Sequence, residues 1–298
     1  MSPEEDIRAI LLTMSTLYVV ATPIGNLSDT SRRAIDILGS VDGVLAEDTR
    51  RTKVLMDHFE LRTPLTSLHE HNEASRISGI LDRLESGQRL ALVSDAGTPL
   101  VSDPGERLVR TVVDAGHDVV PIPGPSAILS ALVGAGFPAV PFTFHGFLPR
   151  KKGPRRSLLE RIVGASETSI VFEAPDRLNA LLDDLAEMAS EDRQVVVARE
   201  MTKIHEEFFR GTMHDAARYY RERRPRGEIT VVVSPGAAHE GAKRIDMAAG
   251  KALAQALLKD GLTPSRAARE VASRLKIAKN MAYDIVHSLP ETGKEESG

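Results

Sequence analysis

The stretch RLALVSDAGTPLVSDPG, residues 89–105, decides the fold prediction because it joins a strand, a loop and the start of a helix. Residues 89–93 form a short apolar run, which is typical of strands that are buried on both faces of a parallel sheet. Small residues and the carboxylate of Asp95 follow, and Pro104 stands where proline is tolerated, in a first helical turn. The stretch therefore predicts a strand, a loop and then a helix over residues 105–115.

The same alternation of β-branched runs and amphipathic stretches continues on both sides of this unit. In the first half it predicts strands at residues 17–21, 43–46 and 118–122, and helices at residues 29–38, 51–59, 76–84 and 125–133. In the second half it predicts strands at residues 169–173, 194–199 and 228–234, and helices at residues 176–189 and 213–224. Because each crossover between parallel strands needs a helix, this order predicts an α/β fold with largely parallel strands.

Composition divides the 298 residues into several parts. The alternation breaks near residues 137–144, and a linker is predicted at residues 234–241. After it the chain is rich in Ala, Lys and Arg, and three short helices are predicted at residues 246–258, 263–275 and 278–289. The predicted parts are an N-terminal extension (1–14), a first α/β domain (15–138), a second α/β domain (139–236), a basic helical module (242–290) and a disordered tail (291–298).

Several function classes are excluded by what the sequence lacks. Without cysteine the chain forms no disulfide, cysteine-ligated metal site or thiol nucleophile. It has no GxGxxG after the first strand, no GxxxxGK[ST], no HExxH and no GxSxG. No apolar run is long enough for a bilayer and the first residues are acidic, so a cytoplasmic protein without a membrane partner is expected. His69 and His71 lack an evident third ligand, so no metal is expected.

Three loops rich in glycine, proline and small residues follow predicted strands of the first domain. They are ATPIGNL (21–27), SDAGTPLVSDPG (94–105) and PGPSA (123–127). In open α/β sheets, ligands bind beyond the carboxyl ends of the strands. Each loop alone is explained as a turn of the chain, but three of them in one domain predict a single ligand pocket. Their spacing does not name the ligand.

These loops belong to a longer series of motifs. The series is TPIGNL (22–27), AEDTR (46–50), HNE (71–73), SDAGTP (94–99), SDPG (102–105), PGPSA (123–127), GFLP (146–149), FEAP (172–175) and REMTK (199–203). On these motifs the chain, from about residue 17 to residue 234, resembles the tetrapyrrole-methylase-like family of S-adenosylmethionine (SAM) methyltransferases, in particular the branch that methylates small-subunit ribosomal RNA. Asp176 departs from the family pattern, which has histidine at this position.

The resemblance implies two α/β domains of the tetrapyrrole-methylase type, with SAM in the cleft between them and usually a homodimer. It implies methyl transfer to the ribose 2′-oxygen of a decoding-centre cytidine in 16S ribosomal RNA, within the small ribosomal subunit, with S-adenosylhomocysteine as product. An adenine needs amide partners and apolar walls, and Asp95 suits the positive charge of the cofactor. The cofactor-binding residues carried over from the family are Pro23, Ile24, Asp95, Ala96, Gly97, Thr98, Ser126, Ala127, Phe172 and Met201.

Methyl transfer to a ribose hydroxyl requires the oxygen and the methyl carbon in line, together with a group that takes the hydroxyl proton. Two dense polar segments supply candidates, residues 47–50 and residues 199–206. The predicted catalytic residues are Asp48, Lys203 and Glu206. Asp48 or Glu206 would help to deprotonate the hydroxyl, whereas Lys203 and Arg50 would hold phosphate or steady the developing charge. The alternative for each is a surface ion pair of little energetic weight.

The net charge of −4 argues against a nucleic-acid partner until it is resolved by segment. Residues 150–161, 218–228 and 241–289 carry net charges of +5, +3 and +5, so the rest of the chain carries −17. A basic loop at residues 151–156 is expected to contact phosphate. The C-terminal helices could dock on structured RNA through Arg266, Arg269, Arg274, Lys276 and Lys279, although each basic segment could also be a solvated face. The predicted RNA-binding residues are Arg50, His71, Asn72, Lys151, Lys152, Arg155, Arg156, Arg177 and Arg199.

Aromatic residues that could stack on a base are sparse, with Tyr219 and Tyr220 as the main candidates, so stacking on a single base is not strongly indicated. Three other functions are compatible with parts of the pattern. A methyltransferase of the same fold could act on a tetrapyrrole or diphthamide precursor, which would need no basic loop and no cationic helices. A non-catalytic RNA assembly factor could keep SAM as a structural ligand. A nucleotide-dependent enzyme of unrelated α/β type would need the phosphate loops that the sequence lacks.

Overall fold

The computed structural model describes residues 15–223, 225–236, 247–260, 262–275 and 279–288. The chain divides after Pro235 into two compact units, which are described one at a time. The predicted N-terminal extension (1–14) and the predicted tail (291–298) lie outside the described residues. Among the described helices, none is long and apolar enough to cross a membrane.

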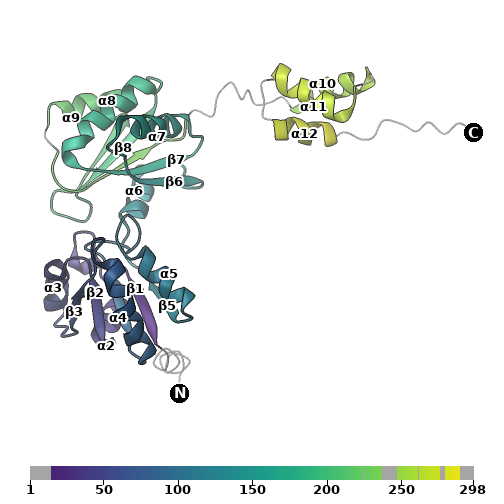
Figure 1. Ribbon diagram of the computed structural model, residues 1–298. Helices are drawn as coiled ribbons and strands as arrows, with labels where there is room; N and C mark the ends of the chain where they lie inside the picture. Colours follow the sequence, from purple (N-terminus) through teal and green to yellow (C-terminus); the bar gives the residue numbers. More distant parts are fainter. Residues whose placement is uncertain (1–14, 224, 237–246, 261, 276–278, 289–298) are drawn as a thin grey trace, which may run out of the picture. The chain divides into compact units, whose positions relative to one another are not determined.

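The larger unit begins with a parallel sheet of five strands in the order β3-β2-β4-β1-β5 (Figure 1). Its strands are β1 (Thr16–Val20), β2 (Gly43–Ala46), β3 (Leu65–Ser67), β4 (Leu90–Val93) and β5 (Asp118–Ile122). Its helices are η1 (Leu27–Asp29), α2 (Arg32–Ser40), α3 (Thr49–His58), α4 (Glu73–Glu85) and α5 (Glu106–Asp114). Tyr18 and Val93 pack with α2 and α3 on one face, and Leu17 and Leu92 pack with α4 and α5 on the other. The apolar strands are thus covered on both faces, as their composition predicts.

Side-chain caps determine where the helices of this sheet begin. The Ser31 hydroxyl accepts a hydrogen bond from the Ala34 N–H (3.1 Å) and starts α2. The helix predicted at residues 29–38 therefore begins later than expected, because residues 27–29 form the short 3-10 helix η1. Ser126 caps α6 (Ala127–Ala135) in the same way by accepting from the Leu129 N–H. Caps of this kind satisfy backbone donors that the first helical turn leaves unpaired.

The second sheet, in the order β6-β7-β10-β8-β9, is mixed. Its strands are β6 (Phe142–Phe147), β7 (Thr168–Glu173), β8 (Gln194–Arg199), β9 (Glu207–Thr212) and β10 (Ile229–Val233). Only β6 and β7 run parallel among the described pairs, whereas β10 pairs antiparallel with β7 and β8, and β8 pairs antiparallel with β9. The prediction of largely parallel strands is wrong here, because β8 returns as β9 through the turn at residues 200–206 without a crossover helix.

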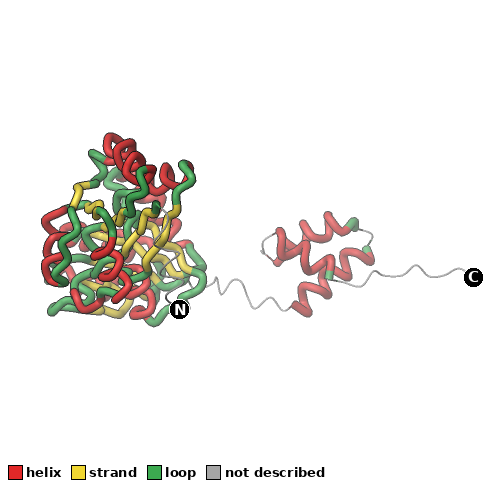
Figure 2. The backbone as a smooth tube through the Cα atoms, turned by 90° about the horizontal axis from the view of Figure 1, so that it is seen from below, coloured by secondary structure: helices red, strands yellow, loops and turns green. Residues whose placement is uncertain are grey.

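Helix α6 follows the first sheet in the chain but packs on the second. Its Ala131, Leu132 and Ala135 share a core with Ile170 and Val232 of the second sheet. The other face is covered by α7 (Lys152–Gly164), α8 (Leu178–Met188), which follows η2 (Pro175–Arg177), and α9 (Met213–Arg221). The strands (yellow) run through the interior of this unit and helices (red) flank them (Figure 2). We call residues 15–126 the first lobe and residues 127–236 the second lobe.

The smaller unit is a bundle of three helices, α10 (Met247–Lys259), α11 (Pro264–Leu275) and α12 (Lys279–His287). Its core contains Ala254, Leu257, Val271 and Ile285. The predicted fold class, α/β followed by a small C-terminal helical module, is confirmed.

Candidate functional site

A cavity of about 440 Å³ is lined by both lobes of the larger unit. Its lining residues are Ile24, Glu47, Arg51, Asp95, Ala96, Gly97, Thr98, Val101, Ser102, Asp103, Ser126, Ala127, Ile128, Phe147, Phe172, Glu173, Ala174, Pro175, Gly227, Glu228, Ile229 and Thr230. All three glycine- and proline-rich loops of the first lobe contribute to this lining. The cavity therefore lies beyond the carboxyl ends of the parallel strands, where open α/β sheets bind ligands.

Hydrogen bonds join the three loops to one another. The Thr22 N–H donates to the Gly97 carbonyl (2.8 Å), and the Gly97 N–H donates back to the Thr22 carbonyl (3.0 Å). The Thr98 hydroxyl donates to the carbonyl of Pro125 in the third loop (3.4 Å). Gly97 has a φ of 80°, which side chains with a β-carbon rarely adopt. The backbone around the cavity is thus held in one arrangement by contacts within the protein.

Carboxylates gather on the first-lobe side of the cavity. Burial raises the pKa of Glu47, and the negative charge of Asp95 adds to the effect. Burial also raises the pKa of Asp103 to about 6, with further contributions from Glu47 and Asp95. One guanidinium, that of Arg51, lies 3.4 Å from the Asp95 carboxylate. This excess of negative charge suits a ligand group that carries positive charge.

Asp48, a predicted catalytic residue, is the N-cap of α3 and is not part of the cavity lining. Its carboxylate accepts from the Arg50 N–H (2.9 Å) and pairs with the Arg50 guanidinium (2.6 Å). Its own N–H donates to the Asp95 carboxylate (3.0 Å). The hydrogen bond from the Arg50 side chain holds the pKa of Asp48 well below its usual range. Asp48 is therefore a weak proton acceptor.

The turn between β8 and β9 contains the other two predicted catalytic residues, Lys203 and Glu206. The Lys203 ammonium pairs with Glu200 (2.7 Å) and Glu228 (3.2 Å). The Glu206 carboxylate accepts from the Thr202 N–H (2.6 Å). Glu200 and Thr202 have φ angles of 51° and 67°, in the left-handed region. These contacts stabilise a turn whose backbone is strained, and such strain concentrates at functional sites.

Gly25 allows this turn to pack against the first of the three loops. A β-carbon on Gly25 would lie 2.5 Å from Cγ of Lys203 and 2.9 Å from Oγ1 of Thr202. Burial lowers the pKa of Lys203, but its bonds to Glu200 and Glu228 outweigh this and raise the pKa overall. Lys203 therefore stays charged, and its two ion pairs lie within the second lobe, while its aliphatic stem packs against Gly25 of the first lobe.

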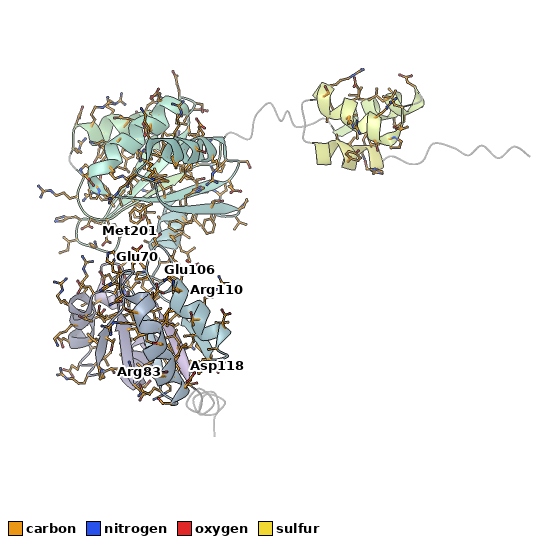
Figure 3. All side chains as sticks on the ribbon, in the orientation of Figure 1. Glu70, Arg83, Glu106, Arg110, Asp118 and Met201 are labelled. Atoms are coloured by element: carbon orange, nitrogen blue, oxygen red, sulfur yellow. The ribbon has the colours of Figure 1, made fainter. Side chains whose placement is uncertain are left out.

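The structure brings most of the predicted cofactor-binding residues together around the cavity. Those in the lining are Ile24, Asp95, Ala96, Gly97, Thr98, Ser126, Ala127 and Phe172. Pro23 and Met201 are not in the lining. Met201 lies where the two lobes meet (Figure 3), and its side chain is buried with Ile24 in one apolar core. Met201 thus supports the wall of the cavity from behind.

The predicted basic loop at residues 151–156 was wrong, because α7 begins at Lys152. Pro154 is compatible with this start, since the first helical turn has N–H groups without helical partners. Arg155 lies on the inner side of α7, where it pairs with Glu173 (3.5 Å) and Asp184 (2.9 Å). The exposed basic residues of this segment are Arg150, Lys151, Lys152 and Arg156.

The remaining predicted RNA-binding residues fall into two groups. Arg50 and His71 are exposed, and Arg50 pairs with Asp48 at the surface (2.6 Å). The others have internal partners: Asn72 with His69, Arg177 with Glu173 (3.2 Å) and Arg199 with Glu207 (2.8 Å). The structure therefore does not place the predicted set on one continuous surface of free cations.

The two tyrosines considered for base stacking are packed against protein groups. Tyr220 is buried in the core under α9. The Tyr219 ring lies 4.9 Å from the Phe209 ring, and the Arg223 guanidinium lies 4.0 Å from its centroid. Neither tyrosine therefore offers a free ring for base stacking, in line with the expectation that these two residues do not strongly indicate it.

Several lining residues are not among the predicted site residues, although Glu47 lies in the candidate segment at residues 47–50. Glu47 directly follows β2, and Asp103 lies within the stretch that decided the fold, so the carboxyl-end rule could have identified both. Phe147 and Glu173 end β6 and β7 of the second sheet, and Glu228 directly precedes β10. The strand order of this sheet was not predicted, so no sequence signal placed these three residues at the cavity.

His69 and His71 lie just before α4, with their ring centroids 6.0 Å apart. The His69 ring is 3.2 Å from the Asn72 amide. Within the part of the chain that the structure describes, no three histidine, aspartate or glutamate side chains come together in a way that could hold a metal ion. The His69 contact belongs to the turn that starts α4.

Comparison with known proteins gives the family of the chain. Residues 16–217 match the family model of the Tetrapyrrole (Corrin/Porphyrin) Methylases. The chain is 42% identical over 280 residues to the ribosomal RNA small subunit methyltransferase I of Synechocystis sp., covering 94% of this chain and 100% of that protein. It is 48% identical over 221 residues to the protein of the same name from Thermotoga maritima, covering 74% and 99%. Among solved structures, a cobalt precorrin-4 methyltransferase shares the fold, with a TM-score of 0.58 at 18% identity over 74% of this chain and 95% of that one. The chain therefore belongs to the tetrapyrrole (corrin/porphyrin) methylase family of methyltransferases, in the branch of relatives named ribosomal RNA small subunit methyltransferase I.

Proposed function

We propose that this protein transfers a methyl group from SAM to the ribose 2′-oxygen of a decoding-centre cytidine in 16S ribosomal RNA. The observation that carries the proposal is the cavity, in which the loops of a parallel sheet and a group of carboxylates face a second sheet. The names of the relatives at 42% and 48% identity support ribosomal RNA as the substrate. The products are the methylated RNA and S-adenosylhomocysteine.

The cavity has the size and the chemistry that SAM requires. Its volume of about 440 Å³ lies within the range of small-ligand sites. SAM carries a sulfonium and an ammonium group, and the carboxylates of Asp95 and Asp103 suit these positive charges. Ile24, Ala127 and Phe172 offer apolar walls for an adenine ring. Backbone groups of the three loops supply hydrogen-bond partners beside these walls.

When bound, SAM would supply a methyl group attached to a positively charged sulfur. The leaving group would be the neutral thioether of S-adenosylhomocysteine. The protein then has two tasks, to hold the ribose oxygen in line with the methyl carbon and to accept the hydroxyl proton. The hydrogen bonds between Thr22 and Gly97 serve the first task, because they fix two of the loops relative to each other. Lys203 serves it as well, because its ion pairs with Glu200 and Glu228 fix the turn that packs against Gly25 of the first loop.

We assign the second task to Glu47 rather than to Asp48 or Glu206. Glu47 lines the cavity directly after β2, and burial raises its pKa, which makes its carboxylate a better base. Asp48 is bound by Arg50 and has a lowered pKa, and Glu206 is bound to the Thr202 backbone. These two residues and Lys203 act in this proposal by shaping the backbone around the site.

Exposed basic residues on both units supply the contacts with RNA. Lys151, Lys152 and Arg156 lie at the start of α7, and Arg266 and Arg269 lie on α11. Lys276, which was predicted for the same role, lies outside the described residues. The proposal places the reaction in the cytoplasm, on a small ribosomal subunit, with the protein as a homodimer.

The test is incubation with labelled SAM and, separately, naked 16S RNA, intact small subunits and a tetrapyrrole precursor. Label is expected in the RNA or the subunit, on a ribose whose 3′-phosphodiester then resists alkaline cleavage, because the 2′-oxygen is blocked. Label only in the tetrapyrrole would contradict the RNA substrate. Label in none of the three, with SAM still bound, would support a non-catalytic assembly factor instead.

A further inference from the structure

Phe147 is an aromatic side chain that stays open to solvent beside the cavity. It is the last residue of β6, 55% of its surface is exposed, and it belongs to the cavity lining. Its ring centroid lies 5.6 Å from that of Phe172, which also lines the cavity. An exposed ring at the edge of a cavity is available to contact a ligand that enters there.

The backbone around Phe147 directs the ring toward the cavity. The pairing of β6 with β7 shifts register between Phe144 and Phe147, and Gly146 has a φ of 66°. An irregularity of this kind re-aims the side chain that follows it, and it is common next to active sites. A β-carbon on Gly146 would lie 3.4 Å from the Ser102 hydroxyl of the first lobe. Phe147 thus leaves the regular alternation of the strand at a point where the lobes meet.

Positive charge follows Phe147 closely in the chain. Arg150, Lys151 and Lys152 are all exposed. Among the described residues none of these three has a carboxylate partner within ion-pair distance. A nucleotide offers the complementary groups, a flat base for the aromatic ring and phosphates for the cations. A neutral apolar ligand would match the ring but not the charges.

We propose that Phe147 stacks on the base of the nucleotide that is methylated, while Arg150, Lys151 and Lys152 hold the phosphates next to it. The proposal rests on the proposed function and adds a substrate-recognition residue to it. Stacking on an aromatic side chain requires a base that is free of its own neighbours, as in single-stranded or looped RNA. A base on Phe147 brings its ribose to the cavity that Phe147 lines.

Three variants of the full-length protein test the proposal. Phe147→Leu removes the ring and keeps an apolar side chain, whereas Phe147→Tyr keeps the ring. Phe142→Leu is the matched control, because Phe142 is another exposed phenylalanine of β6 (37%) and is absent from the cavity lining. For each variant, calorimetry gives the Kd for SAM, and initial rates at saturating SAM give kcat/KM for small subunits or 16S RNA.

Phe147→Leu is expected to lower kcat/KM for the RNA substrate on the order of tenfold, the size of one lost base-stacking contact. Phe147→Tyr and Phe142→Leu are expected to stay close to the wild-type value, and Phe147→Leu is expected to change the Kd for SAM by much less than kcat/KM, because leucine keeps the lining apolar. The variants thus distinguish a stacking role of the Phe147 ring, which lowers kcat/KM for RNA, from a packing role.

Three results would overturn the stacking role. An unchanged kcat/KM in Phe147→Leu would show that the ring does not stack on the RNA. A loss of SAM affinity as large as the loss of kcat/KM would show that the ring is part of the cofactor site. A changed oligomeric state of Phe147→Leu in size-exclusion chromatography would place the ring between two copies of the chain. Failure of the proposed function is distinct, since the wild-type protein itself would then label no RNA.

Discussion

Asp103 is expected to link an acid–base equilibrium to ligand binding. Burial raises its pKa to about 6, and it lines the cavity with Glu47 and Asp95. Above that pH its carboxylate is charged and attracts a positive ligand, and below it the group is protonated and neutral. The affinity for SAM is therefore expected to fall as the pH is lowered through about 6, which calorimetric titration at several pH values measures.

Replacement of Asp103 separates this effect from general acid sensitivity. Asp103→Asn keeps the shape of the side chain and is expected to weaken SAM binding by at least about tenfold, because an ionic partner is lost. Its remaining pH dependence near 6 should be smaller than that of the wild-type protein. Wild-type affinity with a wild-type pH profile in this variant would show that Asp103 does not face the cofactor.

Glu47 and Asp48 are neighbours in the chain, but only Glu47 is assigned as the base, so their variants are expected to differ in methylation rate. Glu47→Gln is expected to lower the methylation rate by about 10²–10⁴-fold, as loss of a general base does, with SAM still bound. Asp48→Asn is the control, because asparagine caps a helix as well as aspartate and should preserve α3 and the rate. Methylation rates at saturating SAM and RNA test both variants. A large loss of rate in Asp48→Asn with little loss in Glu47→Gln would identify Asp48 as the base instead.

Gly25 is required by the close approach of the β8–β9 turn. Gly25→Ala places a β-carbon 2.5 Å from Cγ of Lys203, and the expected cost is about 1–3 kcal/mol of unfolding free energy. Gly79→Ala is the matched control, because Gly79 lies in α4 with no atom within 4 Å of its β-carbon position. That change should stabilise the protein by up to about 1 kcal/mol through helix propensity. Urea unfolding of both variants measures these two changes in unfolding free energy.

At the scale of elements, a buried ion pair attaches α7 to the second sheet. The Glu173 side chain has no exposed surface and lies between Arg155 (3.5 Å) and Arg177 (3.2 Å). Arg155→Ala is expected to cost about 2 kcal/mol of unfolding free energy, less than loss of a whole buried pair because Arg177 remains. Arg156→Ala, which removes an exposed pair with Glu160, should change it by less than about 0.5 kcal/mol. Equal urea midpoints for the two variants would contradict this structural role of Arg155.

The first sheet was predictable because its strands carry their own local signals. β4 is a short apolar run between loops, and a helix follows it after glycine. The second sheet has weaker signals, since β9 has the polar sequence EFFRGT and β6 lies in a segment of prolines and glycines. The pairing of β10 between β7 and β8 is a long-range choice that no window of sequence encodes.

The part of the candidate site that lies on the first lobe was predictable, and the rest was not. The backbone-rich loops of the first lobe were identified because glycine and proline mark turns after strands. Asp48 and Arg155 have polar sequence neighbours, and only the structure shows that one caps a helix and the other pairs inside the fold. Phe147 reaches the cavity through a shift in strand register, which leaves no trace in residue spacing.

At the scale of the whole molecule, a net charge of −4 conceals a basic helical unit. Arg266 and Arg269, three positions apart on α11, share an exposed face of that helix. The double variant Arg266→Gln/Arg269→Gln is expected to weaken small-subunit binding and to reduce its dependence on salt, by about 0.7–0.9 in the logarithmic slope for each lost phosphate contact. SAM affinity should stay unchanged, because neither residue belongs to the cavity lining.

Arg274→Gln is the control for this double variant, because Arg274 already pairs with Glu270 on the same helix (2.8 Å). Filter binding at several salt concentrations compares the variants. An unchanged salt slope in the double variant would mean that this face of α11 does not contact RNA.

The link between β5 and α6 connects the two lobes of the larger unit and also forms part of the cavity wall. β5 belongs to the first sheet and α6 packs on the second, so residues 123–126 are the covalent joint between the lobes. The same residues form the third loop, and Ser126 lines the cavity. Any pivoting of one lobe against the other must bend this joint and reshape the cavity at once. A ligand that fills the cavity is therefore expected to restrict such pivoting.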